Sequence, residues 1–222
     1  MEKTWAVMLL FVTLAAAQYG GPVNPPVTFL PVVGSVLPGE QSYYRILPAS
    51  PQFSFPTVPQ IEDLAAVCNL SPAAGSSVSG QIQLFQSSIN KHDPVHITGT
   101  VHGLTPPGQH GFHLHKDGNI GDNCKAAGPH FNPYNQTHGG PDDAVRHAGD
   151  FGNIDADSYG NANINKVDNH ITLYPGEVTY AIGRAIVVHA GTDDLGKGGN
   201  EESLKTGNAG GRLACCIVEA IK

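Results

Sequence analysis

The stretch Gln109-His110-Gly111-Phe112-His113-Leu114-His115 is the part of the sequence that best indicates the fold. Alternate residues of a β-strand point to the same face, so this run would present His113 and His115 on one face. Other short apolar or alternating runs occupy residues 64–70, 78–85, 95–101, 151–154, 161–167, 182–189 and 213–221. Turns rich in glycine, proline and asparagine separate them. Eight short strands at this spacing predict an all-β fold, an antiparallel sandwich or barrel.

Two long connections interrupt the predicted strands, at residues 116–150 and 190–212. Connections of this length without regular structure are uncommon in compact domains and are usually functional. Metal-ligating residue types gather in or beside them: His130, His138, His147, Asp150 and His189. Imidazole and carboxylate groups are the ligands that borderline cations prefer. The pattern therefore predicts a metal site, although it identifies neither the metal nor the reaction.

The charge of the chain excludes several classes of partner. Its 222 residues include 12 Lys+Arg against 19 Asp+Glu, a formal net charge of −7. Nucleic acids and heparin bind basic surfaces, so this acidic excess argues against both, and we expect no basic heparin-binding tail. Beyond the N-terminal residues, no segment approaches 18 consecutive apolar residues, so we expect no membrane span.

Residues 1–17 have the pattern of a secretory signal peptide. Glu2 and Lys3 precede an apolar run over residues 5–14, and three alanines follow at 15–17. We expect cleavage before Gln18, secretion to the extracellular space and an environment in which cysteines oxidise. A buried N-terminal helix is the alternative interpretation.

Residues 18–61 form a proline-rich extension that contains nine of the 17 prolines of the chain. Proline at this density interrupts helices and strand ladders, so we expect the extension to be largely disordered. It would act as a spacer or, alternatively, as an arm that docks on the domain or on a partner. The folded domain is predicted to span residues 62–222.

Several motifs of this domain occur together, and in the same order, in one known family. They lie at residues 111–115, 128–133, 138–141, 146–153, 183–189, 193–203 and 207–215. Through these motifs the chain resembles copper/zinc superoxide dismutase, and the doublet Cys215-Cys216 resembles the extracellular members. The resemblance implies an eight-stranded antiparallel Greek-key β-barrel with two long functional loops. It does not extend to residues 1–61.

The resemblance also implies one copper and one zinc ion per subunit. Copper would be held by His113, His115, His130 and His189. Zinc would be held by His130, His138, His147 and Asp150. His130 would therefore bridge the two metals. Asp193 resembles the family's carboxylate that hydrogen-bonds His113 and His138 and so fixes both rings.

By the same resemblance, the chain would be an enzyme that converts superoxide to O₂ and hydrogen peroxide through redox cycling of copper. His130 and Arg212 would be catalytic, since His130 takes up a proton when copper is reduced and Arg212 draws the anion toward copper. Lys197 and Lys205 would add to the attraction. A non-catalytic extracellular metal-binding protein of plasma or matrix, reusing the fold, is the alternative from a different class.

Four cysteines allow three pairings into two disulfides. The resemblance implies a bridge between Cys124 and Cys215. Cys216 would then face the first strand, which carries Cys68, because the first and last strands are neighbours in the barrel that the resemblance implies. We expect a second disulfide between Cys68 and Cys216, and two buried free thiols are the alternative.

The chain contains two sequons for N-glycosylation. Asn69-Leu70-Ser71 falls in a predicted strand and precedes Pro72. Asn135-Gln136-Thr137 lies in the first long connection, so Asn135 is the better candidate.

Family members usually form homodimers through an apolar contact. This chain has Asp117 and Glu219 where that contact is expected. Burying unpaired charge is costly, so we expect a weakened homodimer or a different assembly.

Overall fold

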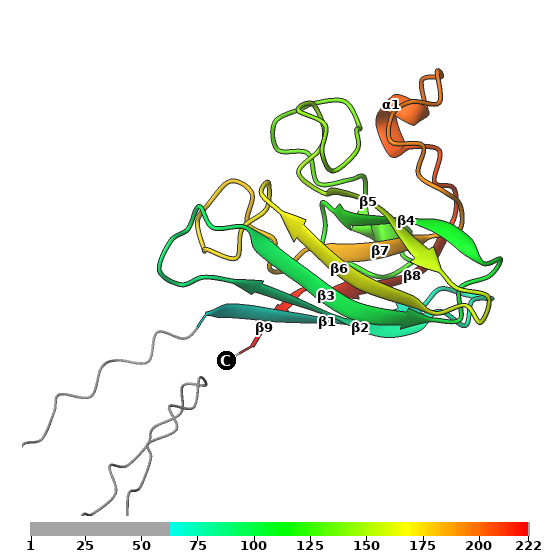
Figure 1. The fold of residues 1–222 in the computed structure, drawn as a ribbon, viewed down its shortest axis with the longest axis horizontal. Helices are drawn as coiled ribbons and strands as arrows, with labels where there is room; N and C mark the ends of the chain where they lie inside the picture. Colours follow the sequence, from blue (N-terminus) through cyan, green and yellow to red (C-terminus); the bar gives the residue numbers. More distant parts are fainter. Residues whose placement is uncertain (1–62, 222) are drawn as a thin grey trace, which may run out of the picture. The chain divides into compact units, whose positions relative to one another are not determined.

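The computed structural model of the chain describes residues 63–221. The expected signal peptide, residues 1–17, and the expected extension, residues 18–61, lie outside these residues. Within residues 63–221, no helix has the length and apolar character that crossing a membrane requires. The described domain consists almost entirely of β-strands and loops (Figure 1).

Each of the eight predicted runs forms a strand. The strands are β1 (Leu64–Pro72), β2 (Ser79–Gln86), β3 (Val95–His102), β4 (Gly108–His115), β5 (Asp150–Ala156), β6 (Ala162–Asp168), β7 (Ala185–His189) and β8 (Arg212–Ile217). The last predicted run is divided at Val218, and the short β9 (Glu219–Ala220) then pairs with β1. Strand β7 begins later than predicted, because Arg184 N–H donates to the Ala181 carbonyl and closes a turn.

The strands form one sheet in the order β5-β4-β7-β8-β1-β2-β3-β6, which curls into a nearly closed antiparallel barrel (Figure 1). Strands β5 and β6 form its two edges and are joined by a turn at residues 157–161. The chain crosses over between β3 and β4 and again between β6 and β7, since neither pair is adjacent in the sheet. This arrangement confirms the predicted all-β Greek-key barrel.

Strand β7 is held on both of its faces. Alternate residues of most strands point inward and fill the barrel, but all five residues of β7 are buried. Its Ile186 and Val188 join the main core, whereas Ala185 and Val187 pack against buried residues of the first long loop. This packing fixes the position of His189 at the end of the strand.

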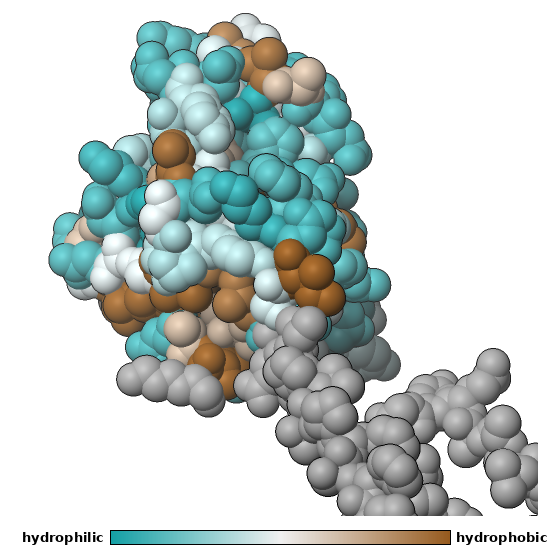
Figure 2. Space-filling view, turned by 90° about the vertical axis from the view of Figure 1, so that its left-hand side faces the viewer, coloured by the Kyte–Doolittle hydropathy of each residue, from teal (hydrophilic) through white to brown (hydrophobic). Residues whose placement is uncertain are grey.

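The two long loops contain little regular structure and rise from the same side of the barrel (Figure 1). They contain only the short helices η1 (Lys125–Ala127) and α1 (Ser203–Thr206) within the described residues. The loops touch where His138 N–H donates to the Leu204 carbonyl. The face of the molecule in Figure 2 is mainly hydrophilic, with hydrophobic residues in separate patches.

Two disulfides join distant parts of the domain. Cys68 of β1 is bonded to Cys216 of β8, with Cα atoms 5.3 Å apart, and Cys124 of the first loop is bonded to Cys215, with Cα atoms 5.9 Å apart. Neighbouring residues of a strand point to opposite faces, so Cys216 reaches into the barrel and Cys215 reaches the loop. Both expected pairings are confirmed, and the described residues include no free cysteine.

We expect the double substitution Cys68→Ala/Cys216→Ala to lower the free energy of unfolding by up to about 5 kcal/mol, because the bridge closes a long loop in the unfolded chain. Denaturant unfolding measures the change. Metal content should stay the same, since neither cysteine belongs to the metal-ligand groups described below. An unchanged free energy of unfolding would contradict the stabilising role.

Candidate metal centre

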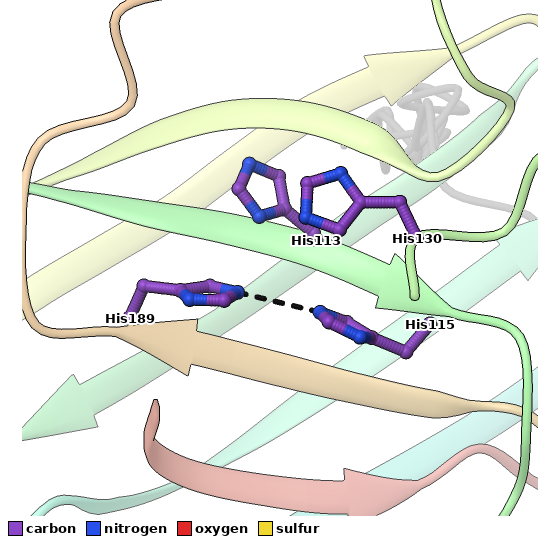
Figure 3. A group of neighbouring side chains, drawn as sticks. All are labelled: His113, His115, His130 and His189. Atoms are coloured by element: carbon purple, nitrogen blue, oxygen red, sulfur yellow. Dashed lines mark hydrogen bonds between the residues drawn. The ribbon is translucent and has the colours of Figure 1, made fainter. Parts of the chain in front are cut away.

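Strands β4 and β7 bring three histidines to one end of the barrel. His113 and His115 lie on β4, which pairs with β7, and His189 ends β7. His130 reaches them from the first long loop through a backbone bridge to His115. All four side chains are buried, and they offer nitrogens within 4.8 Å of one another (Figure 3). The structure therefore brings together the four residues that the sequence predicts for copper.

The rings of His115 and His189 face each other with two unprotonated nitrogens. Nδ1 of His115 lies 2.8 Å from the Gly128 carbonyl oxygen, and Nδ1 of His189 lies 3.3 Å from that of Gly210. A carbonyl oxygen can only accept, so both Nδ1 atoms carry the proton. The two Nε2 atoms, joined by the dashed line in Figure 3, are then both acceptors at 3.3 Å. Their lone pairs repel each other unless a cation lies between them.

His113 and His130 complete this group with one free nitrogen each. Nε2 of His113 donates to Oδ2 of Asp193 at 2.8 Å, which leaves Nδ1 as an acceptor. Nδ1 of His130 lies 2.8 Å from Oδ1 of Asp150, which leaves Nε2. Both remaining nitrogens are buried and have no hydrogen-bond partner among residues 63–221.

Burial keeps these four imidazoles neutral. It lowers the pKa of His113 and His115 well below the usual range, and the nearby His130 and His189 lower both further. Burial also lowers the pKa of His130, although Asp150 opposes the change, and it lowers the pKa of His189 to about 3. A neutral imidazole has the free lone pair that a metal ion needs.

A second group of ligands surrounds Asp150 on the other side of His130. Oδ1 of Asp150 lies 2.8 Å from Nδ1 of His130, 3.0 Å from Nδ1 of His138 and 3.1 Å from Nδ1 of His147. Oδ2 accepts the backbone N–H groups of Gly139 and His147, at 3.1 and 2.8 Å. The backbone thus orients the carboxylate so that one oxygen faces three imidazoles. These four residues are the ones that the sequence predicts for zinc.

The charges of the second group depend strongly on one another. Burial opposes a charge on His138, but the carboxylates of Asp150 and Asp193 beside its two nitrogens outweigh burial and raise the pKa of His138 to about 9. Burial likewise opposes the charge of Asp150, yet its three imidazole neighbours hold the pKa of that carboxyl well below its usual range. A metal ion bound at this point would replace a proton on His138.

Both donor sets fit the ions expected from the sequence. Three imidazole nitrogens and one carboxylate oxygen are a common set for zinc, whose tetrahedral bonds of about 2.0–2.1 Å place neighbouring ligand atoms about 3.3 Å apart. The contacts of 2.8–3.1 Å to Asp150 Oδ1 approach that spacing. Four imidazole nitrogens, without thiolate or carboxylate, suit copper.

Comparison with known proteins places this centre in a family. The model of the family described as copper/zinc superoxide dismutase (SODC) matches residues 78–218. The chain belongs to the copper/zinc superoxide dismutase family. A superoxide dismutase [Cu-Zn] of Candida glabrata is 50% identical over 153 residues, which span 69% of this chain and 96% of the relative. One of Onchocerca volvulus is 53% identical over 148 residues, which span 65% and 90%. The family binds copper and zinc, in agreement with the two donor sets.

In this member of the family, Asp193 joins the two donor sets. Its Oδ2 accepts from Nε2 of His113 and its Oδ1 from Nε2 of His138, each at 2.8 Å. These are the two hydrogen bonds that the resemblance implies. They fix the tautomer and the orientation of both rings, so that both Nδ1 atoms point to their donor sets.

Sequence reasoning missed two residues that determine the surroundings of Asp193: Asn153 holds its backbone, and Gly207 leaves room for its carboxylate. The side-chain amide of Asn153 accepts the Asp193 N–H and donates to the Asp193 carbonyl, both at 2.8 Å. Gly207 has a φ of 66°, and a Cβ there would lie 1.9 Å from Oδ1 of Asp193 and 2.5 Å from Nε2 of His138. Both lie in the motifs quoted above, but only their contacts in space reveal these roles.

Arg212 lines a pocket of about 310 Å³ together with His115, His130 and His189. Its guanidinium is fixed, because it donates to the carbonyl oxygens of Cys124 at 2.5 Å and Gly128 at 2.6 Å. Burial lowers the pKa of Arg212.

The two lysines expected to assist Arg212 lie outside the lining of this pocket. Lys197 pairs with Asp143 at 3.5 Å, and Lys205 pairs with Glu201 at 3.0 Å. Among the described residues, Arg212 is therefore the one lysine or arginine that lines the pocket.

His110, which precedes His113 and His115 on β4, contacts the backbone of His189 and so supports the centre. Its buried ring lies between the carbonyl oxygens of His189, at 2.9 Å from Nδ1, and Pro106, at 3.0 Å from Nε2. The contact positions the backbone of a predicted copper ligand.

We expect Asp193→Asn to weaken the binding of both metals by about 10–100-fold. An amide has one acceptor oxygen, so at most one of His113 and His138 keeps its hydrogen bond and its tautomer. Copper and zinc affinities of the purified protein measure the effect, with the exposed Asp142→Asn as the isosteric control. Unchanged affinity for both metals would show that Asp193 does not position the ligands.

Proposed function

We propose that the chain is a secreted copper/zinc superoxide dismutase that converts superoxide to O₂ and hydrogen peroxide. The observation that carries this proposal is the pair of complete donor sets that share His130, with a pocket and a fixed cation beside one of them. Copper would be held by His113, His115, His130 and His189, and zinc by His130, His138, His147 and Asp150. When bound, copper supplies the one-electron redox chemistry, and zinc, which has none, supplies structure and positive charge.

His130 is proposed as a catalytic residue because it belongs to both donor sets. Its Nδ1 is directed at Asp150, 2.8 Å away, so the ring keeps one orientation. Its Nε2 is buried, has no hydrogen-bond partner among the described residues, and belongs to a ring that lines the pocket. Nε2 can therefore hold a proton and deliver it to reduced superoxide, which must gain two protons to leave as hydrogen peroxide.

Arg212 is proposed as the second catalytic residue, since it offers a fixed positive charge where the substrate enters. Superoxide is a small anion, and a cation held in a concave, partly desolvated pocket attracts it more strongly than an exposed cation would. The two carbonyl contacts of Arg212 hold the guanidinium in place before the substrate arrives. The guanidinium therefore needs no rearrangement to bind superoxide.

Secretion is the part of the proposal that concerns residues before the described domain. Residues 1–17 are proposed as the signal peptide, 18–61 as a largely disordered proline-rich extension and 62–222 as the enzyme domain of the extracellular type. The two disulfides support this location, because disulfides persist in oxidising compartments and are rare in the cytosol. Nucleic acid, membrane and heparin are not proposed as partners.

A homodimer weakened by Asp117 and Glu219 is proposed, with a different assembly as the alternative. Both residues are exposed in the single chain. An apolar contact between two copies at this surface would bury both charges, which is costly without partners of opposite charge.

The rival function is a non-catalytic extracellular metal-binding protein that reuses the fold. The complete ligand sets, and Arg212 in a pocket beside the copper set, favour the enzyme, since metal storage alone needs no anion-attracting pocket. The proline-rich extension is the feature that favours the rival.

The decisive experiment measures superoxide dismutation and metal content together on the full chain loaded with copper and zinc. We expect activity in the wild-type protein and none in His113→Ala, which lacks a copper ligand but should stay folded and retain zinc. The exposed His92→Ala is the matched control and should keep full activity. A folded wild-type protein with both metals and no activity would favour the rival, and near-normal activity in His113→Ala would exclude the proposed copper site.

We expect Arg212→Glu to slow dismutation and to weaken or reverse its dependence on ionic strength. In the wild-type protein salt screens an attraction, so the rate should fall as salt rises; in the variant salt screens a repulsion. Rates over a range of ionic strength test this, with Lys91→Glu as a charge-reversal control outside the pocket. Equal rates for wild-type protein and Arg212→Glu at low ionic strength would contradict the role of Arg212.

A further inference from the structure

The first long loop carries an exposed sequon that neither donor set uses. Asn135, Gln136 and Thr137 are all exposed, although they lie between two buried metal ligands, His130 and His138. The side-chain amide of Asn135 makes no hydrogen bond within residues 63–221, so its Nδ2 is free to react.

Asn132 holds this sequon in a turn. Its side-chain oxygen accepts the Gln136 N–H at 3.0 Å and its side-chain nitrogen donates to the Gln136 carbonyl at 2.8 Å. Asn135 itself has a φ of 53°, outside the strand region. The sequon is therefore presented away from any strand ladder, which is the setting that an N-glycosylation site requires.

The other sequon is placed differently. Asn69 lies in β1, paired with Gln81 of β2, and its side-chain oxygen accepts from Nε2 of Gln81 at 2.8 Å. Ser71 of the same sequon is paired with Cys215 of β8. Both ends of this sequon are thus held in the sheet.

We propose that Asn135 carries an N-linked glycan and that Asn69 does not, which rests on the proposed secretion of the chain. The donor would be an oligosaccharide linked to a lipid through pyrophosphate. Nδ2 of Asn135 forms a bond to C1 of the first sugar as the bond from C1 to the pyrophosphate oxygen breaks. The lipid pyrophosphate leaves, and the amide loses one proton to a base of the transferase. No oxidation or reduction is involved.

A glycan at Asn135 would start on the wall of a hollow of about 960 Å³. Phe131, Val178 and Leu204 also line this hollow, and Val178 and Leu204 are 63% and 47% exposed. Asn135 is not among the residues that line the copper pocket. A glycan in this hollow would cover the apolar surface of Val178 and Leu204. The hollow borders the copper pocket, with which it shares Pro129, His130, Glu202 and Thr206, but the attachment point lies outside the lining of that pocket.

The test expresses the full chain in a eukaryotic secretory system, once with its own N-terminus and once with residues 1–17 replaced by a known signal peptide. Intact mass before and after digestion with peptide-N-glycosidase counts the glycans. Digestion in ¹⁸O-water converts a glycosylated asparagine to a labelled aspartate, which peptide mapping locates. The variants Asn135→Gln and Thr137→Val remove the sequon in two ways, and Asn69→Gln is the matched control.

We expect one glycan in the wild-type protein and in Asn69→Gln, none in the other two variants, and equal specific activity in all four. The variants at residues 135 and 137 should also bind more of an apolar fluorescent dye than the glycosylated protein. Secreted protein with an unmodified Asn135, or with a glycan at Asn69, would overturn the proposal. If only the chain with the replaced signal peptide is secreted and glycosylated at Asn135, the inference holds and the proposed native secretion fails.

Discussion

Buried imidazole nitrogens that need a positive charge between them are the constraint on which the rest of the structure depends. Nε2 of His115 and Nε2 of His189 approach to 3.3 Å as two acceptors. Three further nitrogens converge on one oxygen of Asp150. The two facing acceptors have no proton between them, and the three nitrogens around Asp150 depend on a single buried carboxylate, so both arrangements are costly to bury. The barrel supplies the rigidity that holds these groups together. Strand β7 is packed on both faces, two disulfides join distant parts of the domain, and one carboxylate, that of Asp193, supports both donor sets.

A buried ion pair connects the zinc-side loop to the barrel. Arg146 donates to the carbonyl oxygen of Asp150 and to the carboxylate of Asp168 at the end of β6. Oδ1 of Asp168 is itself fixed, because it accepts the N–H groups of His170 and Ile171 at 2.7 and 2.9 Å. A buried ion pair often adds little net stability, but removing one partner leaves a buried charge unpaired and is costly. Its contribution here is to place Asp150, whose side chain faces three ligands.

The sequence predicts the fold well where local pattern determines it. Alternation of apolar residues located all eight strands, whereas the break at Val218 and the late start of β7 come from backbone hydrogen bonds that no apolar pattern encodes. The residues proposed as metal ligands were predicted from motifs, and their convergence is visible only in the folded chain. Asn153 accepts a hydrogen bond from the Asp193 N–H, 40 residues away in the sequence. This role was missed because a single sequence does not indicate such a contact. The need for glycine at position 207, where a Cβ would collide with the carboxylate of Asp193, was missed for the same reason.

Net charge and local charge act in opposite directions in this molecule. The chain as a whole carries −7, and both lysines of the second loop are paired with acids. The pocket is lined by one arginine, Arg212, and one carboxylate, Glu202, which accepts from the hydroxyl of Thr206 at 2.7 Å. Glu202 is exposed, so water screens its charge, whereas the partly buried guanidinium of Arg212 is screened less. The local field at the pocket therefore favours an anion although the whole chain is acidic, over a range that salt limits to about 8–10 Å.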